Sequence, residues 1–307
     1  MHKPGVVALR PLALGDFFDG AFKTIRLNPR AMVGLAALVT SVFMAVPVLL
    51  SLALAALGEL STGGPSSGLG GVGSAAVLVT YLGSFFGLFA AVVLNGMLVQ
   101  VVAEAVLGRR TTIGAAWAAT RGRMWRLVGL MATTFVLALV LFGVPVAVGV
   151  GVGLRAGVGP GVLVGVPLLL AGLVLYLFVQ VRYFLLAAPA LVLERTGVFA
   201  SLGRAGRLSR GQFWRLFGTM LLAALLVGVV SQVVSVPLGL VGAVGPLLFP
   251  GTTGALMLVL SSFVTQVVVG ALTAPFTSAV TALQYVDQRI RKEGLDVQLI
   301  AASQGTR

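Results

Sequence analysis

The sequence predicts an all-α integral membrane protein with six transmembrane helices, arranged as three hairpins that are each preceded by an amphipathic interfacial helix. Hydrophobic residues make up 58% of the 307 residues and charged residues only 9%, about a third of the charged fraction of a soluble domain. The apolar residues form six long runs, and the basic residues cluster between alternate runs. We therefore expect a multi-pass protein of the cell membrane.

Six apolar runs are long enough to cross the ~30 Å hydrocarbon core of a bilayer. They cover residues 31–57, 74–107, 127–154, 161–193, 216–244 and 253–286. The second run exceeds the core thickness at about 1.5 Å per residue, so its cytoplasmic end should project into the interface. The fourth run is expected to break near Pro189.

The distribution of basic residues predicts the orientation. The segments 58–73, 155–160 and 245–251 contain only Arg155, whereas 19 of the 21 Lys and Arg lie in the other segments and the termini. Cytoplasmic loops are enriched in Lys and Arg. We therefore expect both termini in the cytoplasm and three short hairpin loops on the other side.

An amphipathic helix is expected before the first span. Its apolar residues recur with helical spacing at Leu14, Phe17, Phe18, Ala21, Phe22 and Ile25. Such a helix would lie along the cytoplasmic headgroup layer and end at Asn28-Pro29.

The same arrangement recurs further along the chain. Residues 121–129 match residues 210–218 at six of nine positions. We predict one membrane domain made of three repeat-like units, approximately 10–108, 109–194 and 195–295, followed by a flexible tail, 296–307.

The residue types leave little from which to build a catalytic site. The chain has no Cys, and its one His is His2. Thiolate sites and cysteine nucleophiles are excluded, and a single His cannot form a histidine metal site. The glycine-rich stretches lack a Walker lysine, so close helix packing explains them better than nucleotide binding. We expect no enzyme activity, no cofactor and no metal.

Polar side chains concentrate in the second, fourth and sixth runs. The candidate intramembrane polar residues are Asn95, Gln100, Glu104, Gln180, Arg182 and Gln266. Because polar side chains avoid lipid, these runs should line the bundle interior. Glu104 and Arg182 lie near the cytoplasmic ends of their spans. We favour a structural ion pair or snorkelling for these two charges, with a proton or substrate relay as the alternative.

A second group of residues should face the cytoplasmic membrane surface. Two Trp-Arg pairs open the third and fifth spans, and three arginines follow one another at i, i+3 and i+6 before the fifth. Trp prefers the headgroup level and Arg the phosphates. The predicted contacts with anionic lipid, or with a membrane or cytosolic partner, are Trp125, Arg126, Arg204, Arg207, Arg210, Trp214 and Arg215. Nothing indicates a nucleic-acid-binding fold.

Four stretches occur in a distinctive order. The first is residues 10–16 (Arg-Pro-Leu-Ala-Leu-Gly-Asp), followed by 19–22 and Asn28-Pro29. The others are 188–194 (Ala-Pro-Ala-Leu-Val-Leu-Glu), 213–215 (Phe-Trp-Arg) and 285–287 (Tyr-Val-Asp), which leads into 289–296. Together they resemble a bacterial membrane-domain family that is named after the membrane domain of glycerophosphoryl diester phosphodiesterase. In fused members, the resemblance implies, a separate soluble domain performs the chemistry with His and acidic residues around a metal. This chain lacks those residues, and the resemblance implies no settled role for stand-alone members.

Two functions follow from these observations. The leading expectation is a non-enzymatic membrane scaffold or accessory subunit, whose basic cytoplasmic face binds anionic lipid or a partner. The alternative is a transporter or lipid-handling protein with a polar cavity between the even-numbered spans. That cavity would be lined by Asn95, Gln100, Gln180 and Gln266.

Overall fold

The computed structural model describes residues 11–56, 74–249 and 252–294, and every regular element within these residues is helical. This confirms the predicted all-α class. Six helical stretches are long and apolar enough to cross a membrane, namely Arg30–Ala53, Leu82–Val106, Met124–Ala156, Val158–Leu193, Phe213–Gly245 and Leu256–Glu293. His2, the segment 58–73 and the tail 296–307 lie outside the described residues.

The first unit consists of α1 (Leu14–Leu27), a π-helical turn η1 (Arg30–Gly34) that continues into α2 (Leu35–Ala56), and α3 (Ser74–Val106). The 33 residues of α3 extend for about 50 Å, well beyond the hydrocarbon core of a bilayer.

Helix α1 is rotated relative to the predicted apolar stripe. Phe17 and Ala21 of the stripe are buried in the protein, but Leu14 and Phe22 are about half exposed, and Thr24, which lies outside the stripe, is buried. The reason is that α1 packs against the last helix of the chain rather than lying free on a surface.

The second unit contains one interfacial helix, two spans with π-helical interruptions and one short helix. These elements are α4 (Ile113–Arg121), α5 (Met124–Ala138), η2 (Leu139–Gly143), α6 (Val144–Ala156), α7 (Val158–Val179), η3 (Gln180–Phe184) and α8 (Ala187–Leu193). The predicted break occurs between η3 and α8, just before Pro189.

The turn between α6 and α7 is shorter than the predicted loop 155–160. A single residue outside the helices, Gly157, reverses the chain with a φ of +93°, which glycine adopts readily. Pro160 lies in the first turn of α7, where proline is tolerated because no hydrogen bond is lost there.

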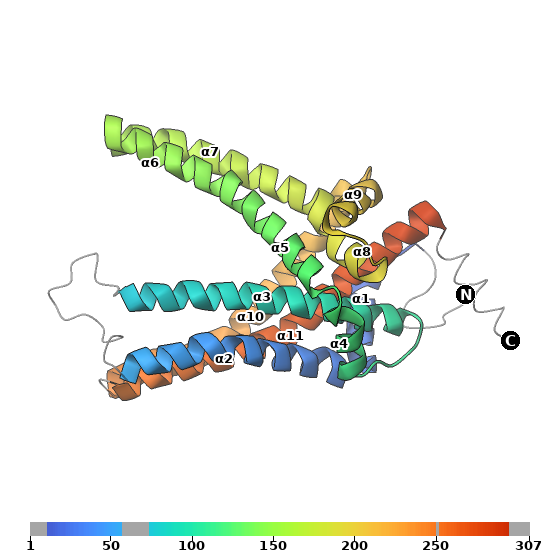
Figure 1. Ribbon diagram of the computed structural model, residues 1–307, viewed down its shortest axis with the longest axis horizontal. Helices are drawn as coiled ribbons and strands as arrows, with labels where there is room; N and C mark the ends of the chain where they lie inside the picture. Colours follow the sequence, from blue (N-terminus) through green and yellow to red (C-terminus); the bar gives the residue numbers. More distant parts are fainter. Residues whose placement is uncertain (1–10, 57–73, 250–251, 295–307) are drawn as a thin grey trace.

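The third unit comprises α9 (Val198–Ser209), α10 (Phe213–Leu248) and α11 (Thr252–Glu293). Within each unit the two spans pack against each other, as α2 with α3, α6 with α7, and α10 with α11. The three interfacial helices α1, α4 and α9 lie at one end of the molecule, which we call the ring end (Figure 1).

The three units contact one another in cyclic order at the ring end. Each interfacial helix packs on the second span of the preceding unit: α4 on α3, α9 on η3 and α8, and α1 on α11. Three hydrogen bonds follow the same order. Asn28 Oδ1 accepts from Thr111 N at 3.4 Å, Arg126 Nη1 donates to Arg195 O at 3.1 Å, and Arg215 Nη2 donates to Leu12 O. Each joins the start of a unit's first span to the residues before the next interfacial helix, so the units close into a ring.

The second spans form the interior of this ring. Helices α3, α8 and α11 contact one another, and their core side chains include Leu98, Val101, Leu191 and Leu283, all fully buried. At this end the even-numbered spans therefore line the interior, as the polar pattern predicts.

At the opposite end the hairpin of α6 and α7, which we call the arm, diverges from the other spans (Figure 1). Glycines bring its two helices together. A Cβ added at Gly161 would lie 2.7 Å from Gly149 O and from Gly153 Cα. The tertiary structure thus uses these glycines for close packing, as predicted.

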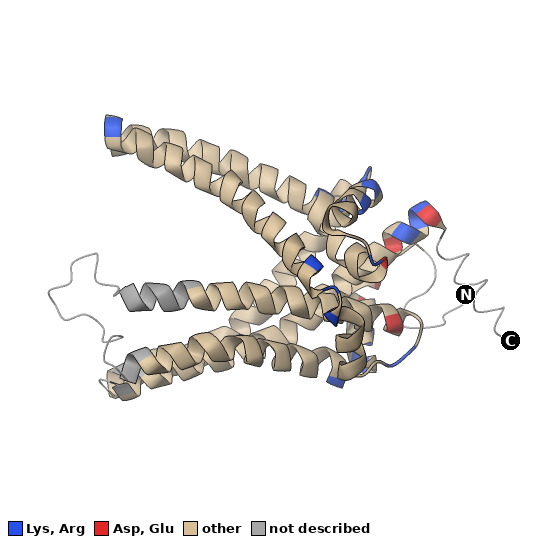
Figure 2. Cartoon of the chain, viewed as in Figure 1, with Lys and Arg blue, Asp and Glu red and all other residues tan. Residues whose placement is uncertain are grey.

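Charge is segregated along the long axis of the molecule. Arg155, in the last turn of α6, lies at the tip of the arm, whereas the other Lys and Arg residues drawn in Figure 2 lie toward the ring end. This segregation matches the predicted asymmetry of the loops.

Candidate functional site

An ion cluster around Asp287 holds the N-terminal segment to α11. The Asp287 side chain is 1% exposed. Leu12 N donates to its Oδ1 at 2.8 Å, and Arg291 Nε donates to both carboxylate oxygens at 3.0–3.1 Å. Arg215 Nη1 lies 3.0 Å from Oδ2 without an aligned N–H, so that contact is Coulombic. Two cations and a backbone donor therefore compensate the burial of one carboxylate.

The same cluster binds both backbone groups of Leu12. Its N–H donates to Asp287, and its carbonyl accepts from Arg215 and, at 3.3 Å, from Arg291. The Arg215 guanidinium also lies over the ring of Phe17, 5.6 Å from the centroid. The contact between the third and first units is thus ionic, hydrogen-bonded and aromatic at once.

A second ion cluster joins α8, α9 and α11. Arg204 donates to both carboxylate oxygens of Glu194 at 2.9–3.0 Å, and its Nη1 lies 2.5 Å from Glu293 Oε1. Arg289 donates to Glu293 at 3.0 Å, and the Tyr285 hydroxyl donates to Glu194. The hydrogen bond with Glu194 raises the pKa of Arg204, so its guanidinium stays charged.

These clusters occupy two of the residues predicted to contact lipid or a partner. Arg204 and Arg215 are only 22% and 23% exposed, and their guanidinium groups face carboxylates inside the protein. Arg126 is exposed but donates to the carbonyls of Arg195 and Thr196. The remaining predicted contact residues lie on the surface, namely Trp125, Arg207, Arg210 and Trp214.

Glu104 and Arg182 do not pair with each other. The ion-pair partner of Glu104 is Arg109, 3.9 Å away and well exposed. Arg182 donates to Ser209 Oγ at 3.2 Å, and that hydroxyl donates back to the Arg182 carbonyl at 2.6 Å. Each charge is therefore used locally, and Arg182 serves to connect η3 with α9.

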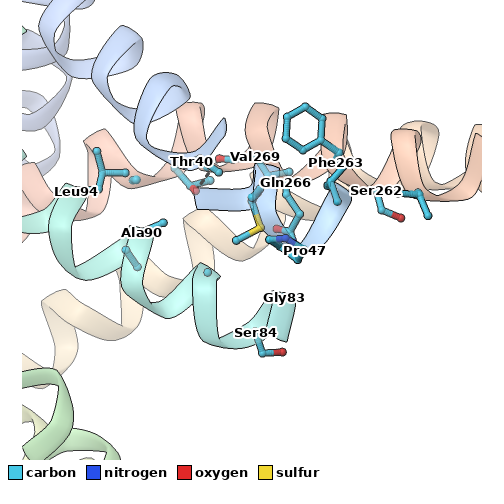
Figure 3. Close-up of a pocket in the computed structure, with 18 of the residues that line it drawn as sticks. Thr40, Pro47, Gly83, Ser84, Ala90, Leu94, Ser262, Phe263, Gln266 and Val269 are labelled. Carbon is cyan, nitrogen blue, oxygen red and sulfur yellow. Dashed lines mark hydrogen bonds between the residues drawn. The ribbon is translucent and has the colours of Figure 1, made fainter. Parts of the chain in front are cut away.

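A groove of about 800 Å³ lies between α2, α3 and α11. Glycine and alanine on α3, including Gly83, Gly87 and Ala90, leave the space open because they carry little or no side chain. Figure 3 shows Gln266 of α11 beside Pro47 of α2, with Gly83 on the facing wall. No charged side chain occurs among the described residues that line this groove.

Most hydroxyl protons in the groove are already used. Ser51 donates to Pro47 O at 2.6 Å, and Ser262 donates to Leu258 O at 2.8 Å. Gln266 is exposed, and its amide makes no hydrogen bond within the described part of the chain. Among the described residues that line the groove, Gln266 is the one whose side chain offers both N–H donors and a carbonyl acceptor.

A smaller pocket of about 310 Å³ lies between α3, α5 and the end of α7. It is lined by Asn95 and Gln180, whose amide oxygens are buried without a hydrogen-bond partner in the described structure. Gln266 lines the separate groove, and Gln100 lines neither space. The four residues predicted to share one polar cavity are therefore divided.

Comparison of the chain with protein-family models, curated proteins and solved structures gives no match. The family resemblance is thus carried by its four stretches alone and stays a prediction. The structure does bring these stretches together, because Leu12, Glu194, Arg215, Tyr285 and Asp287 all take part in the two ion clusters.

Sequence reasoning missed both clusters. A signal was available, since three of the eight acidic residues, Glu194, Asp287 and Glu293, adjoin apolar runs within or beside the resembling stretches. Among the residues that the structure describes, no group of three or more His, Asp or Glu side chains could hold a metal ion.

Proposed function

We propose that this protein is a non-enzymatic membrane scaffold of the bacterial plasma membrane, with its ring end and both termini in the cytoplasm, where it binds anionic lipid headgroups. The charge segregation along the molecule supports this proposal most directly. The ion clusters neutralise Glu194, Asp287 and Glu293 internally, so the exposed Arg207 and Arg210 remain available for phosphates.

Aromatic side chains support the same placement. Trp125 and Trp214 are 86% and 79% exposed, and Phe199 on α9 is 80% exposed. Such exposure of large aromatic side chains would be unfavourable in water, but Trp next to Arg suits the headgroup layer of a bilayer. The ring end would therefore lie at the level of the headgroups, with the spans extending from it into the hydrocarbon.

Tryptophan fluorescence tests the proposal, because all three Trp residues, Trp117, Trp125 and Trp214, belong to α4, α5 and α10 at the ring end. The protein is reconstituted in phosphatidylcholine vesicles that contain increasing fractions of brominated phosphatidylglycerol or brominated phosphatidylcholine. We expect the anionic lipid to quench more strongly at equal mole fraction. High salt should remove most of the difference, since it screens exposed charges.

Matched charge variants make the test specific. The double variant R207Q/R210Q should weaken the preference for phosphatidylglycerol by up to about 1 kcal/mol per arginine. The control R155Q makes the same chemical change at the tip of the arm and should leave the preference unaltered. Equal quenching by the two lipids, or an equal effect of R155Q, would contradict the proposal.

The alternative function receives support only in its lipid-handling form. The groove between α2, α3 and α11 is large enough for a lipid-like ligand. A polar transport path is less well supported, because Asn95 and Gln180 are separated from Gln266.

A further inference from the structure

The groove contains an amide at a depth where a bilayer holds no water. Gln266 is about 21 Å from Thr252, the first residue of α11, and about 28 Å from Tyr285 in the second ion cluster, at about 1.5 Å per residue. An unbonded amide in hydrocarbon is unfavourable by several kcal/mol. Because Gln266 is exposed and unbonded within the described protein, a hydrogen-bonding group from another molecule should face it.

The shape of the groove limits what that molecule can be. Its volume of about 800 Å³ falls in the range of ligand pockets, ~300–1,000 Å³. Its walls are mostly apolar, from Met44 and Pro47 on α2 to Leu94 on α3 and Phe263 on α11. The occupant is therefore expected to be an amphiphile with hydrocarbon chains.

The chemistry around Gln266 limits the polar group of the occupant. No charged side chain lines the groove within the described residues, so nothing there would neutralise a phosphate or an ammonium group. Pro47 has no N–H to donate to the carbonyl of the preceding turn, and the Ser51 hydroxyl has already donated its proton. Acceptors, one amide and the Thr40 hydroxyl thus line the space, and a hydroxyl group of a ligand can both donate and accept there.

We propose that the groove is a binding site for one uncharged, hydroxyl-bearing amphiphile of the diacylglycerol type. Its hydroxyl bonds to the Gln266 amide, and its chains pack against Gly83, Gly87 and Ala90 of α3. A phospholipid would keep its charged headgroup at the interface, about 20 Å away from this amide. The site is independent of the proposed headgroup binding at the ring end.

Native mass spectrometry of the delipidated protein with dioleoylglycerol tests this inference. The wild-type chain should bind one molecule. G83L should abolish binding by filling the groove, since a Cβ at Gly83 meets nothing within 4 Å and the larger side chain can be accommodated. The control G151L places the same side chain on α6, where a Cβ likewise meets nothing within 4 Å, and should bind normally.

The polar contact is tested separately by Q266L. Loss of one hydrogen bond should weaken dioleoylglycerol binding about tenfold. The variant should also lose discrimination between dioleoylglycerol and trioleoylglycerol, which has no hydroxyl group. The tryptophan quenching described above should be unchanged in both G83L and Q266L, which shows that they fold and separates this proposal from the proposed function.

Two results would overturn the inference. In the first, G83L binds dioleoylglycerol as well as the wild-type chain does. In the second, phosphatidylcholine binds the wild-type chain as tightly as dioleoylglycerol and shows the same sensitivity to G83L, which would make the occupant an ordinary phospholipid.

Discussion

Replacing Asp287 by Asn removes the negative charge shared by Arg215 and Arg291 while keeping a side chain of the same size. Breaking a fully buried ion pair by removing one partner costs about 3–5 kcal/mol. Here the Arg215 and Arg291 side chains are still 23% and 30% exposed, so water screens part of the lost attraction between the charges. We expect D287N to lower the free energy of unfolding by about 2 kcal/mol, because the new amide oxygen can still accept from Leu12 N.

The alanine variant separates charge from hydrogen bonding. D287A also leaves the Leu12 N–H unbonded, which adds about 1 kcal/mol for the lost hydrogen bond. We therefore expect D287A to lower the free energy of unfolding by about 3 kcal/mol. Hydrogen exchange at Leu12 should accelerate in D287A more than in D287N.

The assay is unfolding in SDS–detergent mixtures followed by tryptophan fluorescence. The matched control is D19N, since Asp19 pairs with Lys23 at 2.5 Å but the two side chains are 61% and 51% exposed. Such exposed pairs contribute only about 0.3–0.5 kcal/mol. If D287N destabilised no more than D19N, the reasoning that burial makes the Asp287 cluster important would be refuted.

Three further predictions concern other parts of the molecule. G161A should destabilise the arm by about 1–3 kcal/mol in the same SDS titration, because its Cβ would meet facing backbone at 2.7 Å; G159A, with open space around its Cβ, should not. The chain has no Cys, so single introduced cysteines report the orientation of the protein in the membrane. In intact cells an impermeant maleimide should label V158C directly and R110C only after permeabilisation. The reverse pattern would exclude the proposed orientation. E194Q should lower the free energy of unfolding by about 2 kcal/mol, because it weakens the bonds of Glu194 to the Arg204 guanidinium. An effect no larger than that of D19N would count against the second ion cluster.

The sequence alone determined the features that depend on local composition. Hydropathy located all six spans, because each span must bury its whole length in lipid, and most of the predicted ends lie within four residues of the observed ones. The glycines of the arm were predicted to pack closely for a similar reason, since few other roles suit them in an apolar helix. The unequal distribution of Lys and Arg is likewise visible in the chain and matches the charge segregation of the folded molecule.

Only the tertiary structure decided which side of each interfacial helix faces inward. The i, i+3, i+6 spacing of Arg204, Arg207 and Arg210 predicts one basic face, yet Arg204 turns toward Glu194 and Glu293. Helix α1 is rotated from its predicted stripe because it docks on α11. Spacing along one helix cannot identify the helix that packs against it.

The ring closure and the groove also required the fold. Leu12 meets Asp287 across 275 positions of the chain, and Gln266 faces a space made by helices from two units. Hydrophobic burial selects the spans segment by segment, whereas these contacts depend on which segments become neighbours. The sequence therefore determined a six-span membrane protein with one basic end, and the packing of its helices determined which charges stay free and where the groove between α2, α3 and α11 lies.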